Sequence, residues 1–135
     1  MKNSKVLKVI LFISGFIAIG IGATILTMPV AFYATSGINL HGNVSLLNEV
    51  RASGGALLAC GILITLGAFI ARLTFTSVVI SSLLYLSYGL SRMMSVVIDG
   101  MPVDSLIQAL VLELVIGLVC IVALMRFSIK DGRAA

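Results

Sequence analysis

The sequence predicts an all-α protein built as a bundle of four membrane-spanning helices, and three observations carry that prediction. First, 60% of its 135 residues are hydrophobic and only 10% are charged, which leaves too little polar surface for a water-soluble domain. Second, it contains four apolar segments longer than the roughly 20 residues that a helix needs to cross a bilayer. Third, polar or helix-breaking residues separate these segments. Residues 1–135 are therefore predicted to form a single transmembrane domain.

The first predicted span covers residues 6–28. Lysines precede it, and Pro29 ends it because proline cannot donate the next helical hydrogen bond. This start resembles a secretory signal peptide, but the apolar stretch is longer than the roughly 7–15 residues of a signal-peptide core. We therefore expect a retained helix, followed by a polar loop over residues 33–45.

The other three spans are predicted at residues 46–71, 74–98 and 104–125. A very short turn at Arg72 joins the second span to the third, so these two helices are expected to be antiparallel neighbours. After the third span comes the sequence Asp99-Gly100-Met101-Pro102, which is typical of a compact turn because glycine accepts a positive φ and proline cannot extend the preceding helix.

The distribution of basic residues predicts the orientation of the bundle. Seven of the nine lie on one side of the predicted membrane, and only Arg51 and Arg92 lie nearer the other. The positive-inside rule then places both termini and the Arg72 turn in the cytoplasm. No basic run or aromatic-basic stripe is present, so we expect no nucleic-acid partner despite the net charge of +4. The seven cytoplasmic basic residues are Lys2, Lys5, Lys8, Arg72, Arg126, Lys130 and Arg133.

Ionisable residues within or at the ends of the apolar spans locate a candidate polar site. Arg51, Arg92, Asp99 and Glu113 are such residues. A charge near the centre of a bilayer costs roughly 2.5–3.5 kcal/mol on insertion scales, so these residues usually pair with one another and face the interior of a bundle. We therefore expect an outward-facing, charge-balanced cluster.

Glu113 is the most unusual of these residues, because it lies nine positions after Asp104 and hence ~13 Å along the fourth helix. Its neighbours are apolar, so it must be protonated or meet a partner from another helix. Arg51, Arg92, Tyr85 and Tyr88 are the candidates, and we favour Arg92 because its long side chain can cover the remaining gap.

Helical periodicity groups further residues with these charges. The third span places six polar residues on one face: Ser81, Tyr85, Tyr88, Arg92, Ser95 and Asp99. The second span has a partly polar, partly small face: Asn48, Arg51, Ala52, Gly55 and Ala59. The first has a small-residue face of Ser14, Ala18 and Gly22, which suits close helix packing. The predicted polar site consists of Asn48, Glu49, Arg51, Tyr85, Tyr88, Arg92, Asp99 and Glu113.

The sequence contains no recognisable catalytic or metal-binding constellation. His41 has no second ligand at metal-binding spacing. Cys60 and Cys120 lie within apolar helices without a CxxC motif, which argues against a thiol oxidoreductase. No nucleophile–base pair or phosphate-cradling glycine loop is evident. We expect a protein that is not an enzyme and that uses no metal or other cofactor.

Several short motifs together resemble those of the bacterial family known as domain of unknown function 4345. They are Asn48-Glu49-Val50-Arg51-Ala52 followed by Gly54-Gly55, then Ser91-Arg92, and Asp99-Gly100-Met101-Pro102. Glu113 falls where that family tends to place a fourth-helix acid. The resemblance covers nearly the whole chain and implies a four-span bundle in which these residues share one polar site. It also implies a multi-pass protein of a bacterial inner membrane, with the lipid bilayer as its surroundings.

These observations leave three functional hypotheses open. In the first, the polar site binds a small amphipathic ligand, a lipid or a partner helix, with Arg51 and Arg92 as anion anchors. In the second, Glu113 exchanges a proton in a small proton-coupled transporter, for which four spans would require a homodimer. In the third, the protein is a structural or assembly subunit of a membrane complex, and the charged pair only fixes helix register.

Overall fold

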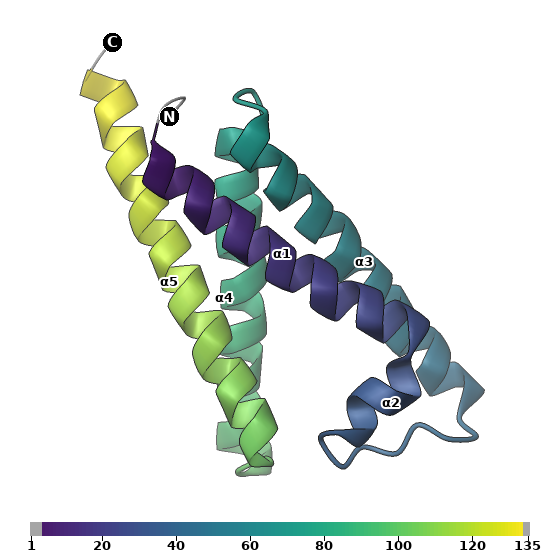
Figure 1. The fold of residues 1–135 in the computed structure, drawn as a ribbon. Coiled ribbons are helices and arrows are strands. Elements are labelled where there is room, and N and C mark those ends of the chain that lie inside the picture. The colour runs from purple at the N-terminus through teal and green to yellow at the C-terminus, as the bar shows by residue number, and fades with distance from the viewer. Residues whose placement is uncertain (1–3, 134–135) are drawn as a thin grey trace.

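The computed structural model describes residues 4–133, with side chains described up to residue 127. This part of the chain is entirely helical apart from turns and loops (Figure 1). Four of its helices are long and apolar enough to cross a membrane, which confirms the all-α prediction and its four long apolar helices. The elements are α1 (Lys5–Thr27), α2 (Pro29–Ala34), α3 (Val44–Phe69), α4 (Thr74–Asp99) and α5 (Asp104–Arg133).

Local capping explains where several of these helices begin and end. The side chain of Ser4 accepts a hydrogen bond of 3.3 Å from the backbone N–H of Leu7 at the start of α1. Asn43 does the same for Leu46 at 2.9 Å, so α3 begins at Val44, two residues before the predicted position. Gly100 follows α4 with a φ of 97°, a conformation that favours glycine.

The short helix α2 differs from the sequence-based expectation, which placed a polar loop over residues 33–45. Met28 leaves the helical conformation with φ −130° and ψ 55°, and Pro29 then opens a second helix rather than only ending the first. Proline fits the first turn of a helix because its missing N–H has no partner to lose there. A helix of six residues is too short to give a clear periodic signal in sequence.

Helices α1 and α3 pack with their backbones nearly in contact. A Cβ atom added to Gly22 would lie 2.5 Å from the backbone nitrogen of Leu58, and one added to Gly61 would lie 2.6 Å from that of Ile19. Side chains cannot occupy such spaces, so glycine at these positions sets the distance between the helices. The predicted small-residue face of α1 (Ser14, Ala18, Gly22) is buried as this packing requires.

The predicted packing face of α3 is wrong. Ala52 and Ala59 are exposed, whereas Gly54 and Gly61 are buried against α1. Both faces of α3 carry small residues, so sequence composition could not distinguish them. The face with glycines at the contact points allows the closer approach because glycine has no Cβ.

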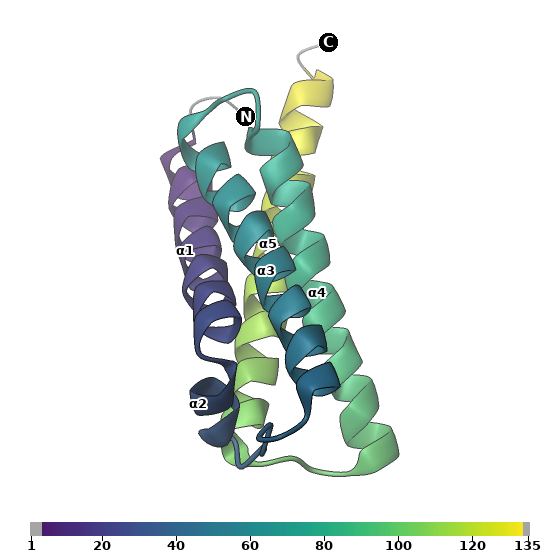
Figure 2. The same ribbon diagram turned by 90° about the vertical axis from the view of Figure 1, so that its right-hand side faces the viewer.

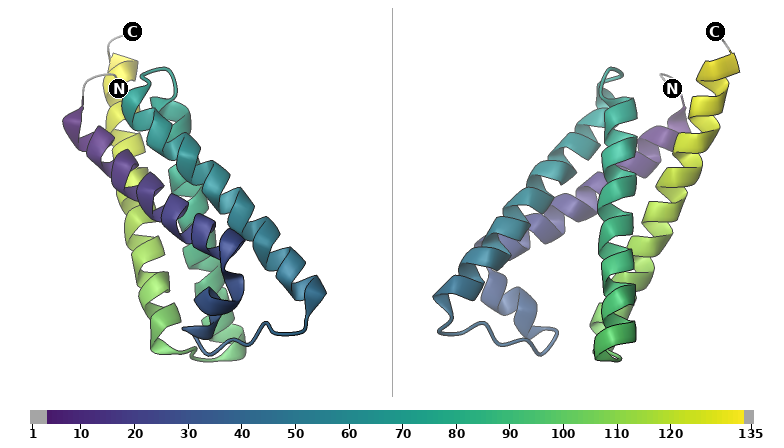
Figure 3. Two further views of the ribbon diagram at one scale, coloured as in Figure 1. Left: turned by 45° about the vertical axis from the view of Figure 1, so that its right-hand side comes forward. Right: turned by 180° about the vertical axis from the view of Figure 1, so that it is seen from behind.

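The two helix pairs α1–α3 and α4–α5 form a V. Both termini and the α3–α4 turn lie at its narrow end, and α2 lies at the other end together with the α4–α5 turn (Figure 2). The right view of Figure 3 shows the pairs diverging, with α2 in the gap between them. A core at the narrow end joins the pairs; its buried residues are Leu7, Leu11, Ile64, Ala68, Val78 and Ala123.

Polar side chains strengthen the narrow end where α3 meets α4. The hydroxyl of Thr74 donates a hydrogen bond of 2.9 Å to the carbonyl of Gly67, and that of Ser77 donates one of 2.8 Å to the carbonyl of Leu63. These bonds hold α3 and α4 together beside their short connection. The wide end lacks an equivalent core and contains a cavity instead.

Candidate functional site

A cavity of about 350 Å³ lies between the arms of the V. Its lining comes from the halves of the four long helices that are nearest to α2, and from α2 and the loop after it. The inner lining is mainly aliphatic: Ile17, Ala18, Ile21, Ile25, Leu57, Leu84, Leu106, Ala109 and Leu112. The polar residues of the lining are Tyr33, Thr35, Ser36, Ser53, Tyr85, Tyr88, Arg92, Ser105 and Glu113.

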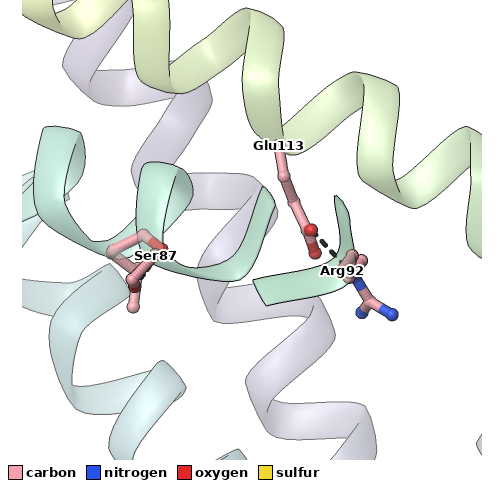
Figure 4. A network of polar contacts seen from close by, with 4 residues as sticks. Ser87, Arg92 and Glu113 are labelled. Carbon is pink, nitrogen blue, oxygen red and sulfur yellow. Dashed lines mark hydrogen bonds and ion pairs between the residues drawn. The ribbon is translucent and has the colours of Figure 1, made fainter. Parts of the chain in front are cut away.

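An ion pair between α4 and α5 lies on the wall of this cavity. Arg92 Nε donates a hydrogen bond of 2.8 Å to Glu113 Oε2 (Figure 4). The side chain of Glu113 is 15% exposed and that of Arg92 is 34% exposed, so the carboxylate is the more enclosed partner. The structure thus pairs Glu113 with the residue that the sequence favours.

The guanidinium of Arg92 is only partly used by this pair. Its terminal nitrogens point away from Glu113 (Figure 4), and Glu113 is its only hydrogen-bond partner among the described residues. Arg92 also lines a second, smaller cavity of about 70 Å³ between α4 and α5, together with Ser95 and Pro102. Arg92 therefore borders both cavities.

Tyr33 and Tyr88 bring hydroxyl groups to the same region. Tyr88 is on α4, one turn before Arg92, and Tyr33 comes from α2. Burial raises the pKa of Tyr33, the nearby Tyr88 raises it further, and the positive charge of Arg92 partly opposes both. Tyr33 therefore keeps its proton at neutral pH and can donate a hydrogen bond into the cavity.

Tyr85 lines the deeper part of the cavity and is tied to a buried polar network. Its hydroxyl donates to the backbone carbonyl of Ser14 on α1. The hydroxyls of Ser14 and Ser81 are 3.2 Å apart, and Ser81 Oγ also lies 3.2 Å from Cys120 Sγ. This network joins α1, α4 and α5 on the side of the cavity that faces the narrow end of the V. Cys120 is buried and Cys60 is half-buried.

The remaining four predicted site residues do not line the cavity. Asn48, Glu49 and Arg51 are exposed at the start of α3, and Asp99 is exposed at the end of α4. Asp99 accepts a hydrogen bond of 2.8 Å from Ser95, one turn earlier on the same helix. The structure thus brings together Tyr85, Tyr88, Arg92 and Glu113 and separates them from the other four.

Arg51 contacts the backbone of α1, whereas the sequence predicts it as an anion anchor of the polar site. Its Nη1 atom donates a hydrogen bond to the carbonyl of Leu26 in the last turn of α1. Carbonyls in the last turn of a helix lack intrahelical partners and carry partial negative charge, so a guanidinium stabilises them. Arg51 therefore caps α1 from the neighbouring helix.

This contact gives the first prediction. We expect Arg51→Met to lower the free energy of unfolding by about 1 kcal/mol, because a hydrogen bond from a charged donor is lost while the aliphatic stem is kept. Glu49→Gln, two residues away and also exposed, should change it by less than about 0.5 kcal/mol. Denaturant titration followed by circular dichroism measures both. Equal stability of the two variants would show that the Leu26 contact contributes nothing.

Sequence reasoning missed the contribution of α2 and its following loop. Tyr33 and Ser36 both line the cavity, and Ser36 Oγ lies 3.0 Å from Ser105 Oγ at the start of α5. The only signal was the apolar, partly aromatic run after Pro29, which is compatible with a short packed helix. Within the described residues, no group of three His, Cys, Asp or Glu side chains could hold a metal ion.

These features define the class of the protein: a small bundle of four apolar helices, of the kind found in multi-pass membrane proteins, with one ion pair on the wall of an interior cavity. A family model described as "Domain of unknown function (DUF4345)" matches residues 6–124, and the chain belongs to this family. The resemblance seen in its sequence motifs is thereby confirmed. Comparisons with curated proteins and with solved structures gave no match.

Proposed function

We propose that this protein spans a bacterial inner membrane and binds a small amphipathic molecule in the cavity between its helix pairs. The cavity itself is the observation that carries the proposal, because its lining is aliphatic on the inside and polar around Arg92. Ligand sites are typically concave spaces of roughly 300–1,000 Å³ with mostly apolar walls and a few polar groups that fix orientation. The present cavity has these properties.

The orientation of the site follows from the charge distribution. With both termini and Arg72 in the cytoplasm, the wide end of the V faces the periplasm. The cavity is then accessible from the outer half of the membrane. A ligand could reach it from the outer leaflet or from the periplasm.

Cysteine labelling tests this orientation. In a variant without Cys60 and Cys120, we expect Asn39→Cys to react with a membrane-impermeant maleimide in intact spheroplasts. Arg72→Cys should react only after the membrane is permeabilised. The reverse pattern would overturn the orientation, and labelling of both sites in intact spheroplasts would overturn the spanning arrangement.

A variant that fills the cavity tests the binding proposal. Ala109 lines the cavity, whereas Val111 on the same helix is exposed on the outer surface. We expect native mass spectrometry of gently extracted protein to find a bound small molecule in the wild type and in Val111→Phe. Ala109→Phe should retain at least about tenfold less of this bound molecule, because the aromatic ring occupies the space that the ligand needs.

Two outcomes of this experiment would contradict binding in the cavity. One is equal occupancy in Ala109→Phe and the wild type, provided that both variants have the same helical content. The other is a wild-type protein that carries no small molecule. If such a protein instead copurified with another membrane protein, the structural-subunit hypothesis would be favoured.

A second candidate function rests on the position of Glu113. It lies within an apolar span, beside both the cavity and Arg92, as expected for a group that exchanges a proton during transport. Flux driven by an imposed pH gradient in proteoliposomes should then be lost in Glu113→Gln. Normal flux in that variant would contradict this function.

A further inference from the structure

We infer that the ligand is a single-chain amphiphile with a carboxylate head, in which the head binds the terminal nitrogens of Arg92 and the chain fills the aliphatic part of the cavity. This inference rests on the proposed function and specifies its ligand class. Three features of the site support it: the unused edge of the guanidinium, the surplus of hydrogen-bond donors around it, and the volume of the cavity.

The unused edge of Arg92 determines the shape of the head group. Glu113 accepts a hydrogen bond from Nε with one oxygen, and the terminal nitrogens point away from it (Figure 4). These two nitrogens present a planar pair of donors, which matches the two oxygens of a carboxylate. The pairing with Glu113 fixes the guanidinium plane, so the site is preorganised for a second carboxylate.

The other polar groups nearby favour an anionic head over a cationic one. Tyr33 and Tyr88 bring hydroxyl groups that can donate hydrogen bonds to an oxyanion. Ser36 and Ser105 are hydrogen-bonded to each other, which leaves one further hydroxyl proton for the ligand. The single carboxylate of the lining, Glu113, is already paired with Arg92. A cationic head would therefore have to compete with the guanidinium for that carboxylate.

The charge balance limits the head to one negative charge. Arg92 and Glu113 are the only charged residues among the described ones that line the cavity, and they neutralise each other. Each added negative charge must be stabilised by the partly exposed side of Arg92 and by hydroxyl groups. The smaller cavity beside Arg92 has room for water next to this side chain. The site can therefore stabilise a head group with a single negative charge. A doubly charged phosphate would be strongly disfavoured next to Glu113.

The volume of the cavity limits the chain. A cavity of about 350 Å³ is near the lower end of the roughly 300–1,000 Å³ that is typical of ligand pockets. This small size favours a single-chain compound over a two-chain lipid.

The tyrosines supply a direct signal for the test. The chain contains three tyrosines and no tryptophan, and Tyr33, Tyr85 and Tyr88 all line the cavity. Tyrosine fluorescence of the protein in a neutral maltoside micelle therefore reports only on this site. Saturated carboxylates of 6 to 16 carbons are titrated, beside dodecanol, dodecylammonium and dodecyl phosphate as probes of head-group charge.

We expect affinity to rise with each added methylene group and to level off at the chain length that fills the cavity. Dodecanoate should bind at least about tenfold more tightly than the other three 12-carbon probes. Dodecanol lacks the negative charge, dodecylammonium is repelled by Arg92, and the second negative charge of dodecyl phosphate is repelled by Glu113. Arg92→Gln should reduce dodecanoate to the affinity of dodecanol, and Arg92→Lys should recover only part of the difference.

Two results would overturn the inference while leaving the proposed function intact: equal affinity for dodecanol and dodecanoate, or tightest binding of the cation or the phosphate. No saturable fluorescence change with any probe, combined with an empty cavity in native mass spectrometry, would overturn the proposed function itself. The probe series uses the wild-type protein, so a failure of Arg92→Gln to fold leaves it decisive.

Discussion

Replacing Gly22 with alanine is expected to lower the free energy of unfolding by about 1–3 kcal/mol, the usual cost of overpacking. The new methyl carbon would lie 2.5 Å from the backbone nitrogen of Leu58 and 2.9 Å from the carbonyl oxygen of Gly54. Both contacts are with backbone, which cannot rotate away as a side chain can. The helices α1 and α3 would have to separate, and their contacts along the whole seam would weaken.

Gly20 provides the matched control for this substitution. It lies two residues earlier on the same helix and faces outward, with no atom within 4 Å of an added Cβ. Gly20→Ala should therefore be neutral or stabilising by up to about 1 kcal/mol, through helix propensity alone. Unfolding in a dodecyl sulfate titration, followed by far-ultraviolet circular dichroism, compares the two. If Gly22→Ala were as stable as Gly20→Ala, the close packing of α1 against α3 at Gly22 would be contradicted.

Breaking the Arg92–Glu113 pair is the second change with a large expected effect. We expect Arg92→Met or Glu113→Leu alone to cost about 3 kcal/mol. Glu113→Leu leaves an unpaired guanidinium in an apolar span, and Arg92→Met leaves a carboxyl group that must take up a proton because its partner is lost. The low end of the usual range applies, since the side chain of Arg92 is 34% exposed. Glu113→Gln should cost less, because its amide oxygen can still accept the hydrogen bond from Nε.

The double variant Arg92→Met with Glu113→Leu separates a structural role from a binding role. It contains no unpaired charge, so its stability should return to within about 1 kcal/mol of the wild type. If the pair only fixes helix register, nothing else should change. If Arg92 binds the ligand, the double variant should be folded but unable to distinguish dodecanoate from dodecanol. A double variant as unstable as the two single variants combined would show that the residues do not interact.

Much of the fold follows from local features of the sequence. The four long apolar helices could be predicted because an apolar run of about 20 residues has few alternatives in a chain of this composition. Their ends could be placed approximately because Pro29 and Gly100 restrict the backbone locally. The helical period also placed Tyr85, Tyr88 and Arg92 on one face of α4, and all three line the cavity.

The site could be predicted only in part. Glu113 and Arg92 could be paired from sequence, because few residues can stabilise a charge in an apolar span. Their polarity and shared helix end predict Asn48, Glu49 and Arg51 at the same site, but these residues are exposed and outside the cavity. Tyr33 was missed because its position depends on α2, whose six residues are too few for a periodic pattern.

The sequence by itself determined the four long apolar helices and which charged residues require a partner, because hydrophobicity, helical period and backbone restriction act within a segment. Only the tertiary structure decided that α3 uses Gly54 and Gly61 against α1, that Arg51 caps α1, and that the helix pairs diverge around a cavity. Those choices depend on van der Waals contacts and hydrogen bonds summed between helices, and alternative faces of similar composition differ only when the backbones meet.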